Sequence, residues 1–295
     1  MSNWNKFVKE VGVTLKIKPN DILLKTKIEN LKETVRSIKN SPEHLGQLEM
    51  VIKSKKKSSK ILDHGCGNCL TVLFLILKGY KNVWGATVNF KNDIKTSNYV
   101  NNVNRIISSI LNVKNSKRVI IYNGFNLPFQ KNYFDIIFTK QVLEHISPED
   151  RLDFWYEEKR VLDNDGVLYH QIPHRLVPFE AHTKKWFFHW FPKNINLKIL
   201  GKGSAEYDFT KNYLFLQWPW EIVNDLNNLN LYYKNITYQR LSRRIKGREF
   251  GLLGNLIRII LFSAFRIPLI GKKISKLLSC FFMLELIVTK KNEFF

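Results

Sequence analysis

A short stretch near residue 60 combines residue types that could bind a nucleotide-like ligand. It reads KILDHGCGNC over 60–69, an apolar run that ends in Asp63 and is followed by two glycines. Glycine adopts positive φ without strain and lets a ligand lie against the backbone. The apolar segment over 70–77 predicts a helix whose first N–H groups have no partner within the helix. A strand, a tight turn and a helix in this order hold nucleoside ligands in open α/β sheets.

Three other positions carry groups that could remove a proton from an acceptor. Glu144 and His145 stand side by side just past a predicted strand, and His174 follows the end of another. A His whose pKa lies near neutrality suits a general base. We therefore predict Glu144, His145 and His174 as catalytic residues. The alternative for Glu144 and His145 is a structural pair that holds a helix start and a pocket wall.

The cysteines and the remaining histidines give weaker signals. Cys66 and Cys69 form the Cys-x-x-Cys of a redox pair. Both lie in the glycine turn, however, and a zinc site would need a second ligand pair. Glu180, His182 and His189 could bind a metal, but the spacing of seven between these histidines fits no standard helix site. We therefore predict no metal.

Composition narrows the class of protein. The chain has 295 residues, of which 44% are hydrophobic, enough for a substantial core. Its three cysteines argue against a disulfide-stabilised secreted protein, and residues 1–9 lack the apolar core of a signal peptide. Lys and Arg outnumber Asp and Glu by 47 to 25, a net charge of +22. This charge favours nucleic acid, an anionic membrane or a phosphorylated substrate as partner, although a coding bias toward Lys and Asn would also produce it.

Apolar stretches separated by polar turns predict the elements that position these groups. Strands that alternate with helices indicate an α/β protein with a parallel sheet. After a helical lead-in, the predicted helices are 22–38, 70–77, 95–111 and 218–229. The predicted strands are one ending at Asp63, 82–89, 117–122, one ending at Lys140, 167–172, 231–241 and 282–289.

The glycine turn resembles motif I of the class I S-adenosylmethionine (SAM) methyltransferases. That motif is Asp/Glu-x-Gly-x-Gly-x-Gly; Asp63, Gly65 and Gly67 match it, and Cys69 stands in place of the third glycine. The motif alone carries a risk of false positives.

Two later stretches make the resemblance more specific. NGFNLPFQKNYFDIIFTKQVLEHI over 123–146 is similar to the segment that follows motif I in methyltransferases of type 11, with Asn123 where the family usually has Asp. RVLDNDGVL over 160–168 resembles the family's helix end and turn before strand five. The resemblance covers roughly residues 58–175.

The resemblance implies a Rossmann-like, doubly wound and mostly parallel seven-stranded sheet, the class I methyltransferase fold. In that fold strands six and seven form a hairpin, but here a long basic and apolar segment separates them. We therefore predict a helical N-terminal lead-in over 1–57, a SAM-binding core over 58–175, a substrate segment with strand six over 176–241, a basic amphipathic insertion over 242–280, and a last strand and tail over 281–295.

The resemblance also implies SAM as cofactor and a set of residues that bind it. These are Asp63, Gly65, Cys66, Gly67, Thr87, Val88, Asn123, Gly124, Phe125 and Lys140. Asn123, Gly124 and Phe125 would line the adenine, and Lys140 would lie near the methionine part. Thr87 stands where such folds place an acidic residue for the ribose hydroxyls. A Thr accepts hydrogen bonds there without the charge of a carboxylate.

The basic insertion over 242–280 determines the predicted cellular location of the protein. Its apolar centre is interrupted by Arg258 and Arg266, so it is too short an uncharged run to span a membrane. Its cationic flanks suit a helix lying in a membrane interface, and a cap packed on the sheet is the alternative. We predict a cytoplasmic protein, peripheral on the inner face of the membrane if this helix binds lipid.

The predicted function is methyl transfer from SAM to a small-molecule, glycan or lipid-linked acceptor, at a hydroxyl. Nucleic acid is a less favoured partner, because TKQV over 139–142 replaces the Asn/Asp-Pro-Pro-aromatic motif of base methylation. An RNA ribose methyltransferase and a degenerate, membrane-bound binding subunit stay open as alternatives.

Overall fold

The structure is a computed structural model that describes residues 3–18, 22–38, 48–89, 94–238 and 270–292, together with residues 45, 263 and 267. The chain divides into two compact units. The first comprises Met1–Thr139 and Tyr156–Tyr169, and the second Lys140–Trp155 and His170–Phe295. We describe each unit by itself.

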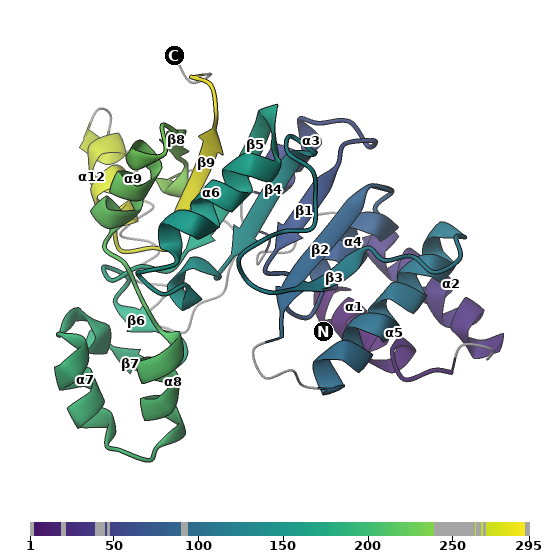
Figure 1. Cartoon of the computed structure of the whole chain (residues 1–295), viewed down its shortest axis with the longest axis horizontal. Coiled ribbons are helices and arrows are strands. Elements are labelled where there is room, and N and C mark those ends of the chain that lie inside the picture. The colour runs from purple at the N-terminus through teal and green to yellow at the C-terminus, as the bar shows by residue number, and fades with distance from the viewer. Residues whose placement is uncertain are drawn as a thin grey trace. The chain divides into compact units, whose positions relative to one another are not determined.

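The main sheet has seven strands in the order β3-β2-β1-β4-β5-β9-β8 (Figure 1). The strands are β1 (Ile61–His64), β2 (Val83–Val88), β3 (Val119–Tyr122), β4 (Phe134–Lys140), β5 (Leu162–Ile172), β8 (Tyr232–Asn235) and β9 (Leu284–Thr289). Strand β1 pairs in parallel with both β2 and β4, β2 pairs in parallel with β3, and β8 pairs antiparallel with β9. This is the predicted Rossmann-like sheet of the class I methyltransferase fold.

The first unit contains helices as well as β1, β2 and β3. The helices are α1 (Asn3–Thr14), α2 (Ile22–Ser37), α3 (Leu48–Lys53), α4 (Leu70–Leu77), α5 (Ile94–Leu111) and the end of α6 (Arg151–Val161). Helix α4 contacts α2, α5 and β2, so most of its residues are buried, which explains its unbroken apolar sequence. All four residues of β1 are buried as well, as expected for a central parallel strand.

Within the described residues, the second unit adds a small hairpin and several helices. The hairpin pairs β6 (Phe179–Glu180) antiparallel with β7 (Lys185–Trp186). Figure 1 shows α7 (Lys193–Leu200) and α8 (Ala205–Tyr213) beside this hairpin, and α9 (Pro219–Asn228) and α12 (Ile270–Ser279) near β8 and β9. Ser204 caps α8 by accepting a hydrogen bond from the Tyr207 N–H, 3.1 Å away.

Element boundaries differ from the prediction at two strands. Strand β5 begins at Leu162, directly after α6 ends at Val161, so the turn expected before strand five is absent. The backbone N–H of Asp165 instead donates to the Asp163 carboxylate within the strand. Strand β8 ends at Asn235, several residues before the predicted end at residue 241.

Most of the predicted membrane-binding insertion, residues 242–280, lies outside the described residues. Within the described part, α12 exposes Lys273, Lys276 and Leu277. No helix among the described residues is long and apolar enough to cross a bilayer. Membrane binding by the insertion therefore stays a prediction.

Candidate functional site

The glycine turn lies at the carboxyl end of β1 and leaves room beside its backbone. The N–H groups of Gly65 and Cys66 both donate to the Ala86 carbonyl, at 2.9 and 3.0 Å, which fixes the turn against β2. Gly65 and Gly67 have φ of 85° and 48°. A Cβ built on Gly67 would meet no atom within 4 Å. The turn therefore offers the open, side-chain-free backbone that a nucleoside ligand needs.

The two cysteines of the turn belong to its packing. Their sulfur atoms lie 3.7 Å apart, and both side chains are buried. The hydrogen bond between them, together with burial, raises the pKa of the Cys66 thiol well above its usual range. A Cβ on Gly85 would lie 2.8 Å from the Cys66 Sγ, so the missing side chain in β2 makes room for this thiol. Cys66 is therefore a packed, protonated thiol, not an activated one.

The other predicted SAM-binding residues of the first unit lie at or just after the ends of the paired strands β2 and β3. Thr87 and Val88 pair in register with the last two residues of β3. A Cβ on Gly124 would lie 3.7 Å from Val88, so the loop after β3 packs on the end of β2. The Asn123 Oδ1 atom accepts hydrogen bonds from two N–H groups of this loop, including that of Phe125. The Phe125 ring, 53% exposed, presents an aromatic face at this edge.

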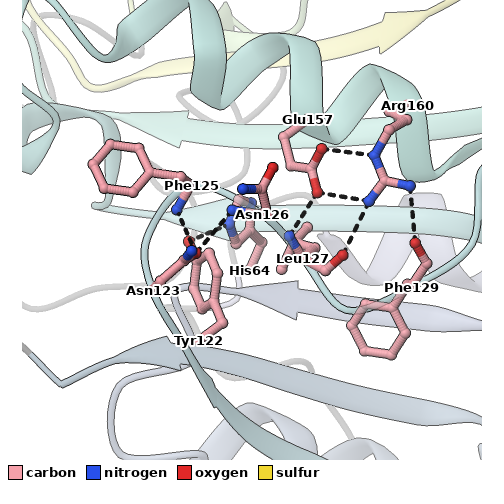
Figure 2. Close-up of polar contacts among 9 residues, drawn as sticks. All are labelled: His64, Tyr122, Asn123, Phe125, Asn126, Leu127, Phe129, Glu157 and Arg160. Atoms are coloured by element: carbon pink, nitrogen blue, oxygen red, sulfur yellow. Dashed lines mark hydrogen bonds and ion pairs between the residues drawn. The ribbon is translucent and has the colours of Figure 1, made fainter.

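Figure 2 shows how helix α6 holds this loop. Glu157 accepts a hydrogen bond from the Leu127 N–H at 2.6 Å and two from Arg160 at 2.6 and 2.7 Å. The same guanidinium donates to the carbonyls of Leu127 and Phe129. Burial works to raise the pKa of Glu157, but these donors lower it overall. The pair thus fixes the loop that carries the predicted adenine-binding residues.

His64, at the end of β1, makes two hydrogen bonds that connect β1 to α6 and to β3. Its Nδ1 lies 2.7 Å from the fully buried Glu158 carboxylate. Its Nε2 lies 2.7 Å from the Tyr122 hydroxyl (Figure 2). A carboxylate can only accept, so Nδ1 donates to Glu158 and Nε2 accepts from Tyr122. The ends of β1 and β3 and helix α6 are therefore joined through one buried histidine. Neither this bridge nor the Glu157–Arg160 pair could be predicted from the sequence, because neither spacing is diagnostic.

The remaining predicted site residues belong to the second unit. Lys140 ends β4, and Glu144 and His145 follow in a single turn of 3₁₀ helix, 143–145. Burial raises the pKa of Glu144 to about 8, and the charge of Glu180 adds to this while a backbone hydrogen bond opposes it. His145 is more accessible, with 28% of its side chain exposed, and burial lowers its pKa.

His174 is buried and fully bonded. Its Nε2 lies 2.8 Å from the Phe282 carbonyl, and its Nδ1 accepts from the Leu176 N–H. Burial lowers the pKa of His174 to about 4, with the nearby His189 adding to the shift and the Phe282 carbonyl opposing it. Both ring nitrogens are thus used in holding the chain, an arrangement that favours a structural role.

His182 joins the predicted pair in the second unit. The rings of His145 and His182 pack edge to face with centroids 5.2 Å apart, and both contact the ring of Phe209 in α8. His182 also pairs with Glu180 of β6, Nδ1 to Oε1, at 2.7 Å. Nitrogen and oxygen atoms of Glu144, His145 and His182 all lie within 4.8 Å of one another.

Residues 62–170 match the family model described as a methyltransferase domain. This region spans the glycine turn, the loop after β3 and the Glu157–Arg160 pair. The match confirms the class to which the sequence resemblance pointed, the SAM-dependent class I methyltransferases, and with it SAM as the cofactor of that class. This part of the chain is a methyltransferase domain.

Solved structures similar to this chain include several methyltransferases. The PH0226 protein of Pyrococcus horikoshii OT3 is 19% identical over 46% of this chain, with a TM-score of 0.35, and the match spans 57% of that protein. A SAM-dependent methyltransferase of Aquifex aeolicus is 17% identical over 74% of this chain and 91% of its own, with a TM-score of 0.39. Geranyl diphosphate C-methyltransferase of Streptomyces coelicolor A3(2) is 13% identical over 94% and 84%, with a TM-score of 0.43. No protein with a curated description is significantly similar to this sequence.

Proposed function

We propose that the chain binds SAM at the glycine turn and transfers its methyl group to a hydroxyl of a small-molecule, glycan or lipid-linked acceptor. The observation that carries the proposal is the open backbone at Gly67, in the turn whose Gly65 and Cys66 N–H groups bond to Ala86 of β2, the strand that pairs with β3. Three consecutive strand ends meet there, the place where open α/β sheets hold their ligands.

Each residue of this edge has a role that its geometry supports. The backbone at Gly67 leaves space for the ligand, because a Cβ there would meet no atom within 4 Å. The Thr87 hydroxyl would hydrogen-bond the ribose, and the exposed Phe125 ring would stack on the adenine. Asn123 would act mainly through the loop, since its carbonyl oxygen already accepts two backbone hydrogen bonds.

Bound SAM would supply an electrophilic methyl on its sulfonium. The chain must then orient an acceptor oxygen and receive or weaken its proton. His145 is the best placed of the three predicted catalytic residues. Its Nδ1 donates to a backbone carbonyl, which leaves the Nε2 lone pair available. His174 has no nitrogen to spare.

Calorimetric titration with SAM tests the binding step. We expect saturable binding with one site per chain, and a folded protein that shows no heat of binding would refute the proposal. Methyl transfer is tested by incubating the protein with SAM labelled in its methyl group and with lipid, glycan, small-molecule and RNA extracts in parallel. Label in the lipid, glycan or small-molecule fraction supports the proposed acceptor class, whereas label in RNA alone favours the ribose methyltransferase.

A further inference from the structure

Three side chains of the second unit bring possible metal-ligand atoms close together. They come from two separate segments, Glu144 and His145 from the 3₁₀ turn after β4, and His182 from the hairpin of β6 and β7. The Glu144 Oε1 lies 3.9 Å from the His145 Nε2, and one ligand atom from each of the three residues falls within 4.8 Å of the others.

The outer contacts of the two histidines fix which nitrogen is free. His145 places Nδ1 2.7 Å from the carbonyl oxygen of Tyr213, and a carbonyl can only accept. His182 places Nδ1 2.7 Å from the Glu180 carboxylate. Nδ1 therefore carries the proton in both neutral rings, and each Nε2 keeps a lone pair. An outer carbonyl or carboxylate on the second nitrogen is how proteins orient metal-binding histidines.

Supporting contacts hold both rings in place. Glu180 is itself held by the N–H groups of His182 and Thr183, at 3.0 and 2.6 Å. The ring of Phe209 stacks on His182 with centroids 4.9 Å apart and meets the edge of His145. The two imidazoles are thus held by the hairpin, by α8 and by their own edge-to-face contact.

Glu144 supplies the second, independent observation. Its side chain is fully buried, and within the described part of the chain neither carboxylate oxygen has a hydrogen-bond partner. Its backbone carbonyl, by contrast, accepts from the Phe215 N–H at 2.7 Å, so the residue is firmly anchored. A buried carboxylate with no donor is costly. Two imidazole lone pairs beside it add no donor, and a bound cation would satisfy all three groups.

We propose that Glu144, His145 and His182 bind a divalent transition-metal ion through one carboxylate oxygen and the two Nε2 atoms. Two histidines and a carboxylate form a donor set that catalytic zinc sites use with one position left open. The same set suits other ions that accept imidazole. A tetrahedral ion with bonds of about 2.0–2.2 Å spaces its ligands about 3.3–3.6 Å apart. The three groups would therefore draw together by roughly 1 Å on binding.

This inference differs from the sequence-based prediction of no metal. Its consequence for the acceptor hydroxyl rests on the proposed function. A metal with an open position would bind the oxygen of an acceptor hydroxyl and lower its pKa, as it does for bound water. Glu144 and His145 would then act on the acceptor through the ion, and no separate base would be needed. The acceptor class this favours carries a hydroxyl next to a second oxygen donor, which can chelate the ion.

Metal binding is tested on the whole chain, first stripped with a chelator and then titrated with Zn²⁺ and with Co²⁺. We expect one ion per chain, and a visible Co²⁺ absorption spectrum of the low-coordinate, nitrogen-containing type. Glu144→Gln, His145→Asn and His182→Asn should each weaken Zn²⁺ binding by at least about 100-fold. Glu180→Gln, which removes only the outer support of His182, should weaken it by about 10- to 100-fold.

The matched control is Glu206→Gln, an exposed carboxylate on α8 that contributes nothing to the cluster. It should bind Zn²⁺ like the parent protein. Circular dichroism establishes which variants fold, and a rise in the melting temperature of the parent protein on adding Zn²⁺ reports binding without any variant. The inference would be overturned if the folded parent protein bound neither ion, or if all three ligand variants bound Zn²⁺ as tightly as the parent protein.

SAM titration of the same samples separates this inference from the proposed function. A protein that binds SAM but neither ion refutes the metal site and leaves the methyltransferase proposal standing. A protein that binds Zn²⁺ but not SAM supports the metal site and refutes the proposed cofactor site.

Discussion

Gly67→Ala gives the sharpest test of where SAM binds, because the structure separates its effect on folding from its effect on the ligand. Gly67 has φ of 48°, and an added Cβ would meet no atom within 4 Å. The substitution therefore costs only the strain of a left-handed alanine, about 1–2 kcal/mol. The lower entropy of the unfolded alanine chain offsets about 0.4–1 kcal/mol of that. We expect a net loss of about 1 kcal/mol in stability, a fall of a few degrees in melting temperature.

The effect on SAM should be larger, since the new methyl group would occupy the space assigned to the ligand. A contact that pushes SAM out of place should raise its Kd at least tenfold, about 1.4 kcal/mol. Calorimetry on the folded variant measures this directly. Valine would be a poorer choice at this position, because a β-branched residue at positive φ is strained enough to disturb the turn itself.

Gly79 provides a matched control in the same unit. It follows α4, has φ of 94°, and an added Cβ there also meets no atom within 4 Å. Gly79→Ala should therefore lower the melting temperature by a similar amount and leave SAM affinity unchanged. An unchanged Kd in Gly67→Ala, or the same loss in both variants, would refute the placement of SAM at the turn.

Three further substitutions test the surroundings of the site. Arg160→Met removes the donors that pair with Glu157 and should lower the free energy of unfolding by about 2 kcal/mol, between the values for exposed and buried ion pairs. Denaturant unfolding measures this loss. Arg160→Lys should not restore the lost stability, because lysine lacks the planar guanidinium fork. Thr87→Asp should preserve or tighten SAM binding through charge-assisted hydrogen bonds to the ribose, and a weaker Kd in the folded variant would show that β2 is misaligned with the family. The pKa of about 4 at His174 means that between pH 6.5 and 4 the unfolded chain binds a proton that the folded chain does not. Stability should therefore fall with decreasing pH over that window, by up to about 3 kcal/mol from this group, and His174→Gln should flatten the dependence; an equal slope in parent and variant would contradict the assignment.

The fold and the ligand-binding edge could be predicted because their signals are local. Asp63, Gly65 and Gly67 mark a strand end and a turn within a few residues, and apolar runs define the neighbouring strands and helices. The structure also gives a reason for the family's third glycine. The residue at that position, Cys69, has φ of 57°, a left-handed conformation that glycine adopts without strain.

The supports of the site could not be predicted, because they join segments that are distant in sequence. Glu157 and Arg160 look like an ordinary pair one turn apart on a helix. Only the fold shows that both reach the backbone over 127–129. Similarly, nothing near His64 in the sequence indicates that its two nitrogens bond Glu158 and Tyr122.

The second-unit cluster shows why spacing along the chain could not predict the metal site that we propose. The sequence pointed to Glu180, His182 and His189 because they lie close together in the chain, and their spacing argued against a metal. The fold instead pairs Glu180 with the Nδ1 of His182 and brings one ligand atom each of Glu144, His145 and His182 within 4.8 Å of one another. The sequence predicted Glu144 and His145 as a base or a structural pair and grouped His182 with Glu180 and His189, whereas the fold brings Glu144, His145 and His182 together. Among the described residues, neither carboxylate oxygen of the buried Glu144 has a hydrogen-bond donor. A carboxylate with a purely structural role would be hydrogen-bonded, and a general base at His145 alone would not require a buried carboxylate beside it.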